Sequence, residues 1–517
     1  MKGGTMAFFS RFYTKGSLLI GVLIVAYLLP IWLFTYFPTQ DGVSHVYNSQ
    51  ILTEYNNPEY QFSDYYEINW YPFPNWLSHF SLAALMFVFP SLIAEKIFLS
   101  LYVILFPLAI YYFLNAVQRG RHALVILSFT FVYNYLFLMG FYNFAVSVPL
   151  FFLALGYWWK HKDEMNRNRI ILLNLLIIIT YFAHLISYAF ILFSIALLAL
   201  LHFRRDFKRI LITGGYLLPA AMLLLVYLPT SDLLAGEPPE FGFGRVGELF
   251  ANLIGMHVLV PYTNPPSWIS GIVSAFLLFL VVATIWQNRR DTTAEHAGQK
   301  AFLYLTVVLL GLYFILPNSI GPGGWVNDRL AILATLAIFA WFRGFDNRQW
   351  KRAFTTVATL LALINLVYVG VLFKNLNAEI RAFNAFVQRV EKNSVILPLH
   401  FDPRGSSERV GIFVNAANYY CLDNGCINLG NYEVQFDYFP TRFNTDFETP
   451  LAEKEWVQVI HWEPERIDLC NYADNVDYLL LWDTPDEPIV AEAIEACYTL
   501  IASEGKLKLY KGQRTAR

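Results

Sequence analysis

Acidic and histidine residues of this chain lie at the end of a long apolar run, where they could do chemistry beside a membrane. The stretch "FPTQDGVSHVYNSQ", residues 37–50, places Asp41 and His45 four residues apart, on one face of a helix. A carboxylate there could accept a proton from a substrate hydroxyl, and a histidine one turn away could orient that carboxylate or the acceptor. Asp41 and His45 are therefore the candidate catalytic residues.

Other polar residues stand at the ends of further apolar runs and could contact a substrate. Arg329 follows a Gly-Pro-Gly-Gly turn in "NSIGPGGWVNDRLAI", and a guanidinium can hold a phosphate with two hydrogen bonds. It could also only extend its side chain to the membrane interface. His79 and His184 could equally be hydrogen-bonding residues between helices. The candidate substrate-binding residues are Arg329, Asp328, Asn327, Lys96, His79, Asn143 and His184.

Two further interpretations of the same residues stay open. Asp41 precedes a glycine and could be the N-cap of a helix that lies in the membrane interface. Asp41 with His45, His79 and His184 could instead ligate a divalent cation, because carboxylates and imidazoles are ligands of such ions. No cofactor is certain from the sequence, and a divalent cation is the one that these residues could hold.

The elements that must position these residues are mostly membrane helices. The 517-residue chain is 56% hydrophobic and 15% charged, whereas soluble domains carry about 25% charged residues. Runs such as 17–38 and 352–373 reach the roughly 20 residues that cross a bilayer. The composition predicts an α-helical polytopic membrane protein, and without a basic run nucleic acid is not an expected partner.

Lys and Arg concentrate in alternate loops, and this bias predicts the orientation of the chain. The pattern gives eleven spans, with the N-terminus cytoplasmic and the C-terminus outside. The loop 39–74 is then extracytoplasmic, and the short, proline-bracketed segment 74–90 should lie in or dip into the outer leaflet. The predicted spans are 17–38, 97–117, 123–140, 144–159, 170–184, 186–203, 209–228, 268–287, 300–317, 329–343 and 352–373.

The tail has a different pattern from about residue 394, so the predicted domains are a membrane part, 1–393, and a small extracytoplasmic α/β domain, 394–517. All four cysteines lie in this tail, which favours disulfides in an oxidising compartment. The pairing Cys421–Cys426 with Cys470–Cys497 is one of three, and a zinc site competes with disulfides. Strands are expected in 394–401, 409–416, 476–482 and 506–511, and a helix in 488–505.

The order of these elements resembles that of GT-C type glycosyltransferases: a first helix that ends before an acidic residue, a long outer loop, a dipping segment, many spans and an outer α/β tail. The resemblance implies transfer, with inversion, of a sugar from a polyprenyl-phosphate donor to a glycan, lipid or protein acceptor, outside a bacterial plasma membrane. "QDGVSHVYN" looks like the acidic motif of the first loop, which implies that Asp41 is the catalytic carboxylate. Arg329 is similar to the residue that holds the donor phosphate. In "GFYNF", Asn143 stands where many members have a second acidic residue, so the chain departs from the family there.

Other classes of protein fit parts of the same pattern. A transporter or flippase of lipid-linked or small polar substrates would also bury polar groups, but it needs a path through both faces. A membrane-anchored binding protein could use the aromatic segment 428–444 to contact a glycan, and a polysaccharide polymerase or ligase would use related substrates. The gathering of polar residues on one face favours the glycosyltransferase.

Overall fold

The computed structural model describes most of the chain. Outside the described part lie the predicted cytoplasmic segment 1–14 and much of the predicted loops 229–267 and 287–300. The described ranges are 15–118, 120–228, 244–263, 268–290, 297–320, 323–345, 347–444, 466–485 and 488–512.

The chain divides into two compact units, and each draws on distant parts of the sequence. The first unit consists of Met1–Leu33, Leu99–Phe137 and Asn143–Gly370. The second unit consists of Phe34–Phe98, Leu138–Tyr142 and Val371–Arg517. The first loop and the C-terminal tail therefore belong to one unit.

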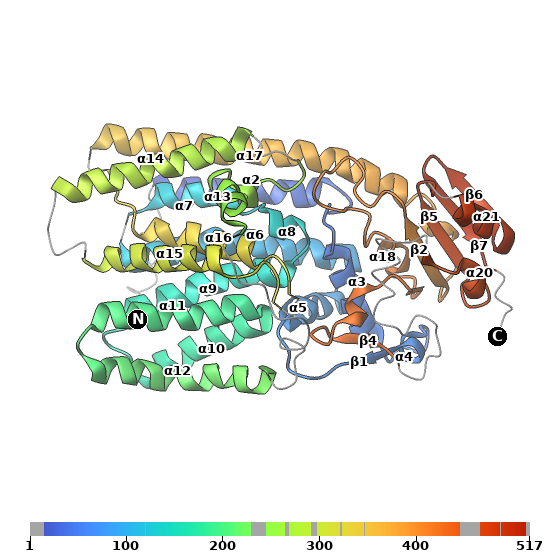
Figure 1. Cartoon of the computed structure of the whole chain (residues 1–517), viewed down its shortest axis with the longest axis horizontal. Coiled ribbons are helices and arrows are strands. Elements are labelled where there is room, and N and C mark those ends of the chain that lie inside the picture. The colour runs from blue at the N-terminus through green and yellow to red at the C-terminus, as the bar shows by residue number, and fades with distance from the viewer. Residues whose placement is uncertain are drawn as a thin grey trace, which may run out of the picture. The chain divides into compact units, whose positions relative to one another are not determined.

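The first unit is built of apolar helices (Figure 1). Among them, α11 packs against α10, α12 and α15, and α15 packs against α16. Four helices, α6, α8, α9 and α17, have residues in both units. The helices are α2 (Lys15–Leu33), α6 (Ser91–Val117), α7 (His122–Ser128), α8 (Tyr135–Leu138), α9 (Tyr142–His161), α10 (Arg167–Ala183), α11 (Leu185–Phe203), α12 (Phe207–Tyr227), α13 (Val246–Ile254), α14 (Trp268–Arg290), α15 (Ala297–Ile315), α16 (Val326–Ala337) and α17 (Arg348–Phe383).

Seven helices of the described part are long and apolar enough to cross a membrane, which indicates an integral membrane protein. They are α2, α6, α11, α12, α14, α15 and α17. The count of eleven spans stays a prediction. One predicted span, 123–140, is not a single helix: α7 ends at Ser128, and α8 begins only at Tyr135. At the break, Asn134 donates to the Phe131 carbonyl at 2.9 Å and accepts from the Phe137 amide at 3.1 Å, so its side chain satisfies backbone groups that a broken helix leaves over.

The second unit contains short helices from the first loop and a sheet from the tail. The helices are α3 (Gly42–Glu54), α4 (Phe62–Tyr65) and α5 (Trp76–Met86); α5 has 11 residues, fewer than a span needs. A two-stranded antiparallel sheet joins loop and tail, since β1 (Tyr66–Ile68) pairs with β4 (Thr441–Phe443).

The tail forms an α/β arrangement around a five-stranded sheet of order β3-β2-β5-β7-β6 (Figure 1). Strand β2 is parallel to β3 and β5, whereas β7 is antiparallel to β5 and β6. The four cysteines form Cys421–Cys426 and Cys470–Cys497, so the zinc interpretation of these residues is wrong. The elements are β2 (Val395–His400), α18 (Asn418–Cys421), β3 (Ile427–Asn428), η8 (Tyr432–Gln435), α20 (Leu469–Tyr472), β5 (Tyr478–Trp482), α21 (Pro488–Cys497), β6 (Thr499–Glu504) and β7 (Leu507–Lys511).

Two expectations about the tail are wrong. The predicted strand at 409–416 is a series of turns whose backbone amides bond locally; the amide of Val414, for example, bonds to the carbonyl of Gly411. The predicted helix at 488–505 ends at Cys497, and the residues after it form β6, which pairs with β7. In both segments, hydrogen bonds made in the folded tail prevail over the local apolar pattern.

Candidate functional site

Asp41 is held where the first loop turns into helix α3. Its backbone amide donates to the carbonyl of Met139 at 3.0 Å. The next residue, Gly140, has a φ of +88°, and a Cβ there would lie 2.4 Å from the Gly42 nitrogen and 2.6 Å from the Asp41 nitrogen. Only glycine tolerates both the backbone conformation and this close approach. Gly140 therefore fixes the position of Asp41 through its backbone.

The side chain of Asp41 is buried and has no cationic partner among the described residues. Gln40 and Asn415 both donate to its Oδ1, at 3.2 and 2.9 Å, and no described residue donates to its Oδ2. Asp41 occupies the N-cap position of α3 without a side-chain cap bond. Burial raises the pKa of Asp41 to about 7; the hydrogen bonds from Gln40 and Asn415 oppose this, and the charge of Glu433 adds to it. A carboxyl group whose pKa lies near neutral pH, and which has one oxygen without a described donor, suits proton transfer.

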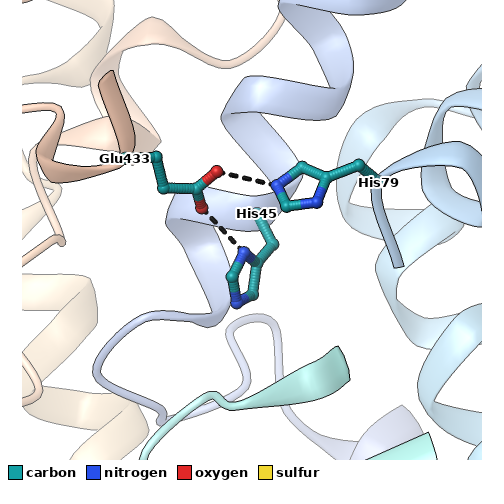
Figure 2. Close-up of side chains that lie close together, drawn as sticks. All are labelled: His45, His79 and Glu433. Atoms are coloured by element: carbon teal, nitrogen blue, oxygen red, sulfur yellow. Dashed lines mark hydrogen bonds and ion pairs between the residues drawn. The ribbon is translucent and has the colours of Figure 1, made fainter. Parts of the chain in front are cut away.

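Glu433 of η8 lies between two histidines of the first loop (Figure 2). Its Oε1 is 2.7 Å from His45 Nδ1 on α3, and its Oε2 is 2.7 Å from His79 Nε2 on α5. His45 is 3% exposed, and the other two are fully buried. Burial would raise the pKa of Glu433, but the two imidazoles outweigh it and lower the pKa to about 2. We call these three residues the His–Glu–His group, and together with Asp41 the carboxylate cluster.

Helix α3 can present these side chains because it is buried on all sides, from Gly42 to Ile51. Its polar residues find partners in the tail: Asn48 and Asn431 exchange two amide hydrogen bonds, at 3.0 and 2.9 Å. Tyr47 donates to the carbonyl of Cys426 at 2.7 Å. Such buried polar pairs fix the register of the helix. An interfacial helix that rests on the membrane is therefore not the structure of this segment.

The His–Glu–His group could hold a metal ion. Its three ligand atoms lie within 4.8 Å of one another, and it is the group of this kind found in the described part of the chain. It includes neither Asp41 nor His184, which the sequence offered as ligands beside His45 and His79. His184 belongs to the first unit, whereas the other residues of that predicted set belong to the second.

A second polar group lies in the first unit. The Arg329 guanidinium is 5.5 Å from the centre of the Phe144 ring, and the His184 ring is 5.3 Å from the same ring. Arg329 Nη1 also donates to the carbonyl of Gly324 at 2.7 Å, within the turn that precedes α16. His184 separates α10 from α11, and its Nδ1 accepts from the amide of Ile186. We call Phe144, His184 and Arg329 the arginine cluster.

The other predicted residues have separate positions. Asn327 donates to the carbonyls of Tyr313 and Leu316, which ties the start of α16 to the end of α15. Asp328 lines a small cavity with Tyr313 and Thr335. Lys96 donates to the carbonyl of Phe34 at 2.8 Å, just beyond the end of α2. Asn143 is buried in the first turn of α9.

Sequence reasoning missed four residues of the site: Glu433, Gln40, Asn415 and Gly140. Glu433 stands in the aromatic segment 428–444, where an acidic residue among rings was a usable signal, because a buried carboxylate needs a partner such as a histidine. For the other three, the sequence has no signal, since their roles depend on contacts between distant segments.

No known family model matches the chain, and no curated protein matches it significantly. The functional argument therefore depends on the site itself.

Proposed function

We propose that this chain is a membrane glycosyltransferase that moves a sugar from a polyprenyl-phosphate donor to an acceptor hydroxyl outside a bacterial plasma membrane. Asp41 is the general base. The single observation that carries this proposal is the buried Asp41 carboxylate, with Oδ1 held by Gln40 and Asn415 and Oδ2 without a described donor. The resemblance to GT-C enzymes in the order of elements, with an acidic residue after the first helix, supports the same role.

The reaction follows from these groups. Asp41 accepts the proton of the acceptor hydroxyl, while the oxygen of that hydroxyl attacks the anomeric carbon of the sugar. The bond between that carbon and the phosphate oxygen breaks, and polyprenyl phosphate leaves with the electron pair. One base and one displacement invert the configuration. Arg329 keeps its proposed role as the group that binds the donor phosphate, in its own unit, where a planar guanidinium gives two donors.

The decisive experiment replaces Asp41 with Asn in the full chain. We expect turnover to fall about 10²- to 10⁴-fold, the range of general-base catalysis, with donor binding retained. Release of polyprenyl phosphate from a panel of polyprenyl-phosphate sugars, followed by mass spectrometry of the acceptor, measures the effect. Asp64→Asn is the matched control, because Asp64 is an exposed carboxylate of the same loop.

Three outcomes would count against the proposal. Undiminished transfer by the Asp41→Asn protein would remove Asp41 from the role of base. An equal loss in the Asp64→Asn protein would indicate a general effect of charge in the loop. Movement of the lipid-linked sugar across the membrane by the wild-type chain, without transfer to any acceptor, would favour a flippase.

A further inference from the structure

The His–Glu–His group has the composition of a transition-metal site. Two imidazoles and one carboxylate, on three separate elements of the second unit, bring their ligand atoms within 4.8 Å of one another. Each imidazole nitrogen faces one oxygen of Glu433 (Figure 2). Two histidines and a glutamate are a ligand set that zinc uses in proteins, with a fourth position left for water or substrate. The group is nearly inaccessible to solvent, so its residues do not form a chance surface cluster.

A second observation concerns the far side of His79. Its Nδ1 donates to the carbonyl of Asn75 at 3.1 Å, because a carbonyl oxygen can only accept. In the neutral ring, Nε2 then presents its lone pair to the Glu433 carboxylate, 2.7 Å away. Two lone pairs at that distance repel each other, so a cation must lie between them, either a proton or a metal ion. Metal-binding histidines commonly donate their other N–H to a backbone carbonyl in this way.

We propose that the His–Glu–His group binds one Zn²⁺ ion, with His45 Nδ1, His79 Nε2 and Glu433 as its ligands. Zinc lies about 2.0–2.2 Å from nitrogen and oxygen ligands. Contacts that are now 2.7 Å long would therefore open by less than about 1 Å to admit it. Zn²⁺ with two neutral imidazoles and the carboxylate has the same net charge as two imidazolium rings with the carboxylate, but it avoids the repulsion between two charged rings whose centres lie 5.0 Å apart.

The ion would act as a clamp. It would join α3 and α5 of the first loop to η8 of the tail, and His45 lies one helical turn from Asp41. The backbone amide of His45 also contacts the carbonyl of Asp41, at 3.3 Å. Zinc would therefore hold the start of α3 in place. This inference does not depend on glycosyl transfer, because metal binding is measured without any substrate.

The test uses the full chain, purified in detergent and stripped with a chelator. Titration with Zn²⁺ should give one ion per chain and a rise in the thermal unfolding midpoint, because the ion binds the folded state. His79→Gln and Glu433→Gln should weaken binding at least about 10-fold, since even supporting residues of zinc sites cost about 10- to 100-fold. His400→Gln is the matched control: His400 is a buried histidine of the same unit, outside the group. Its affinity should stay within about 3-fold of the wild type.

Cobalt gives a readout that needs no variant to fold. Co²⁺ in place of zinc should show the intense visible bands of a four-coordinate site in the wild-type chain, and Zn²⁺ should displace it. Absence of binding by the wild-type chain would overturn the proposal and leave a buried His–Glu–His ion pair. If the Glu433→Gln and His400→Gln proteins bind the metal equally well, the metal binds elsewhere, and the proposal is overturned as well.

Discussion

The carboxylate cluster and the arginine cluster are both buried, yet they are assembled from the chain in different ways. Each residue of the arginine cluster stands at or near the end of an apolar helix: Phe144 in the first turn of α9, His184 between α10 and α11, and Arg329 in the first turn of α16. The carboxylate cluster instead combines two short helices, α3 and α5, with η8 of the tail. An apolar pattern locates helix ends, so it finds the first kind of cluster and only part of the second.

The clusters also differ in charge. No described lysine or arginine forms an ion pair or hydrogen bond with Asp41 or Glu433, and histidines are the basic groups of the carboxylate cluster. The arginine cluster carries a guanidinium, a group that recognises phosphate. Under the proposed function, the group for proton transfer and the group for anion binding belong to separate units of this chain. Each assignment can be tested on its own.

The largest effect after loss of Asp41 itself should come from its backbone support. We expect Gly140→Ala to lower kcat about 10²-fold while leaving KM for the donor within about 3-fold. The added Cβ would meet the backbone of Asp41 and Gly42 and displace the carboxylate, and a shift of about 1 Å can cost this much. Steady-state kinetics with the full chain measure the two parameters separately.

Gly120→Ala is the control for that substitution. Gly120 also has a positive φ, +83°, but a Cβ there would meet nothing within 4 Å. Both variants therefore share the backbone strain, and only Gly140→Ala adds the clash. A similar loss of kcat in both would show that strain, and not the position of Asp41, limits the rate.

In the arginine cluster, we expect Arg329→Lys to reduce kcat/KM for the donor about 10- to 100-fold, because an ammonium cannot reproduce a planar, two-donor grip. Lys96→Arg should stay within about 3-fold, since Lys96 donates to the carbonyl of Phe34 and an arginine can do the same. Donor binding by isothermal titration separates affinity from turnover. Equal effects of the two substitutions would mean that Arg329 only anchors its helix.

Much of the fold could be predicted from the sequence, because helix formation in a membrane follows local apolar composition. The strands β2, β5 and β7 were likewise found from short apolar runs. The broken span near Asn134 and the turns at 409–416 were not predicted, since specific hydrogen bonds determine the backbone conformation there. The pairing of β1 with β4, which joins loop and tail, could not be foreseen, because each strand has three residues.

The candidate site was predicted in part for the same reason. Asp41, His45 and His79 could be named because charged or titratable residues beside apolar runs are unusual. The shared contact of the two histidines with Glu433 could not be predicted, because these residues are separated by most of the chain. His184 belongs to the other unit, so a ligand set that combines it with these two histidines stays a prediction.

The smallest effect should come from an exposed ion pair of the tail, whose loss we expect to cost less stability than any change in the buried carboxylate cluster. Lys506 Nζ lies 2.8 Å from Asp402 and 2.7 Å from Asp483, and its side chain is 49% exposed. Lys506→Met should destabilise the tail by less than about 1 kcal/mol at neutral pH, because solvent screens such pairs. Hydrogen exchange of the β7 amides in the full chain measures the loss.

The pH dependence gives this last prediction its sign. Burial alone would raise the pKa of Asp402, but the hydrogen bond and charge of Lys506, together with hydrogen bonds from the backbone at Gly405 and Arg404, outweigh it and lower the pKa below its usual value. The pair therefore stabilises the tail above the pKa of an unfolded aspartate, about 4, and this contribution disappears as the pH falls through the lower folded value. The difference between wild type and Lys506→Met should vanish in acid. Lys508→Met, in β7 two residues further along and without an ion pair among the described residues, should show no such dependence. A difference that persists in acid would mean that Lys506 acts through packing of its alkyl chain.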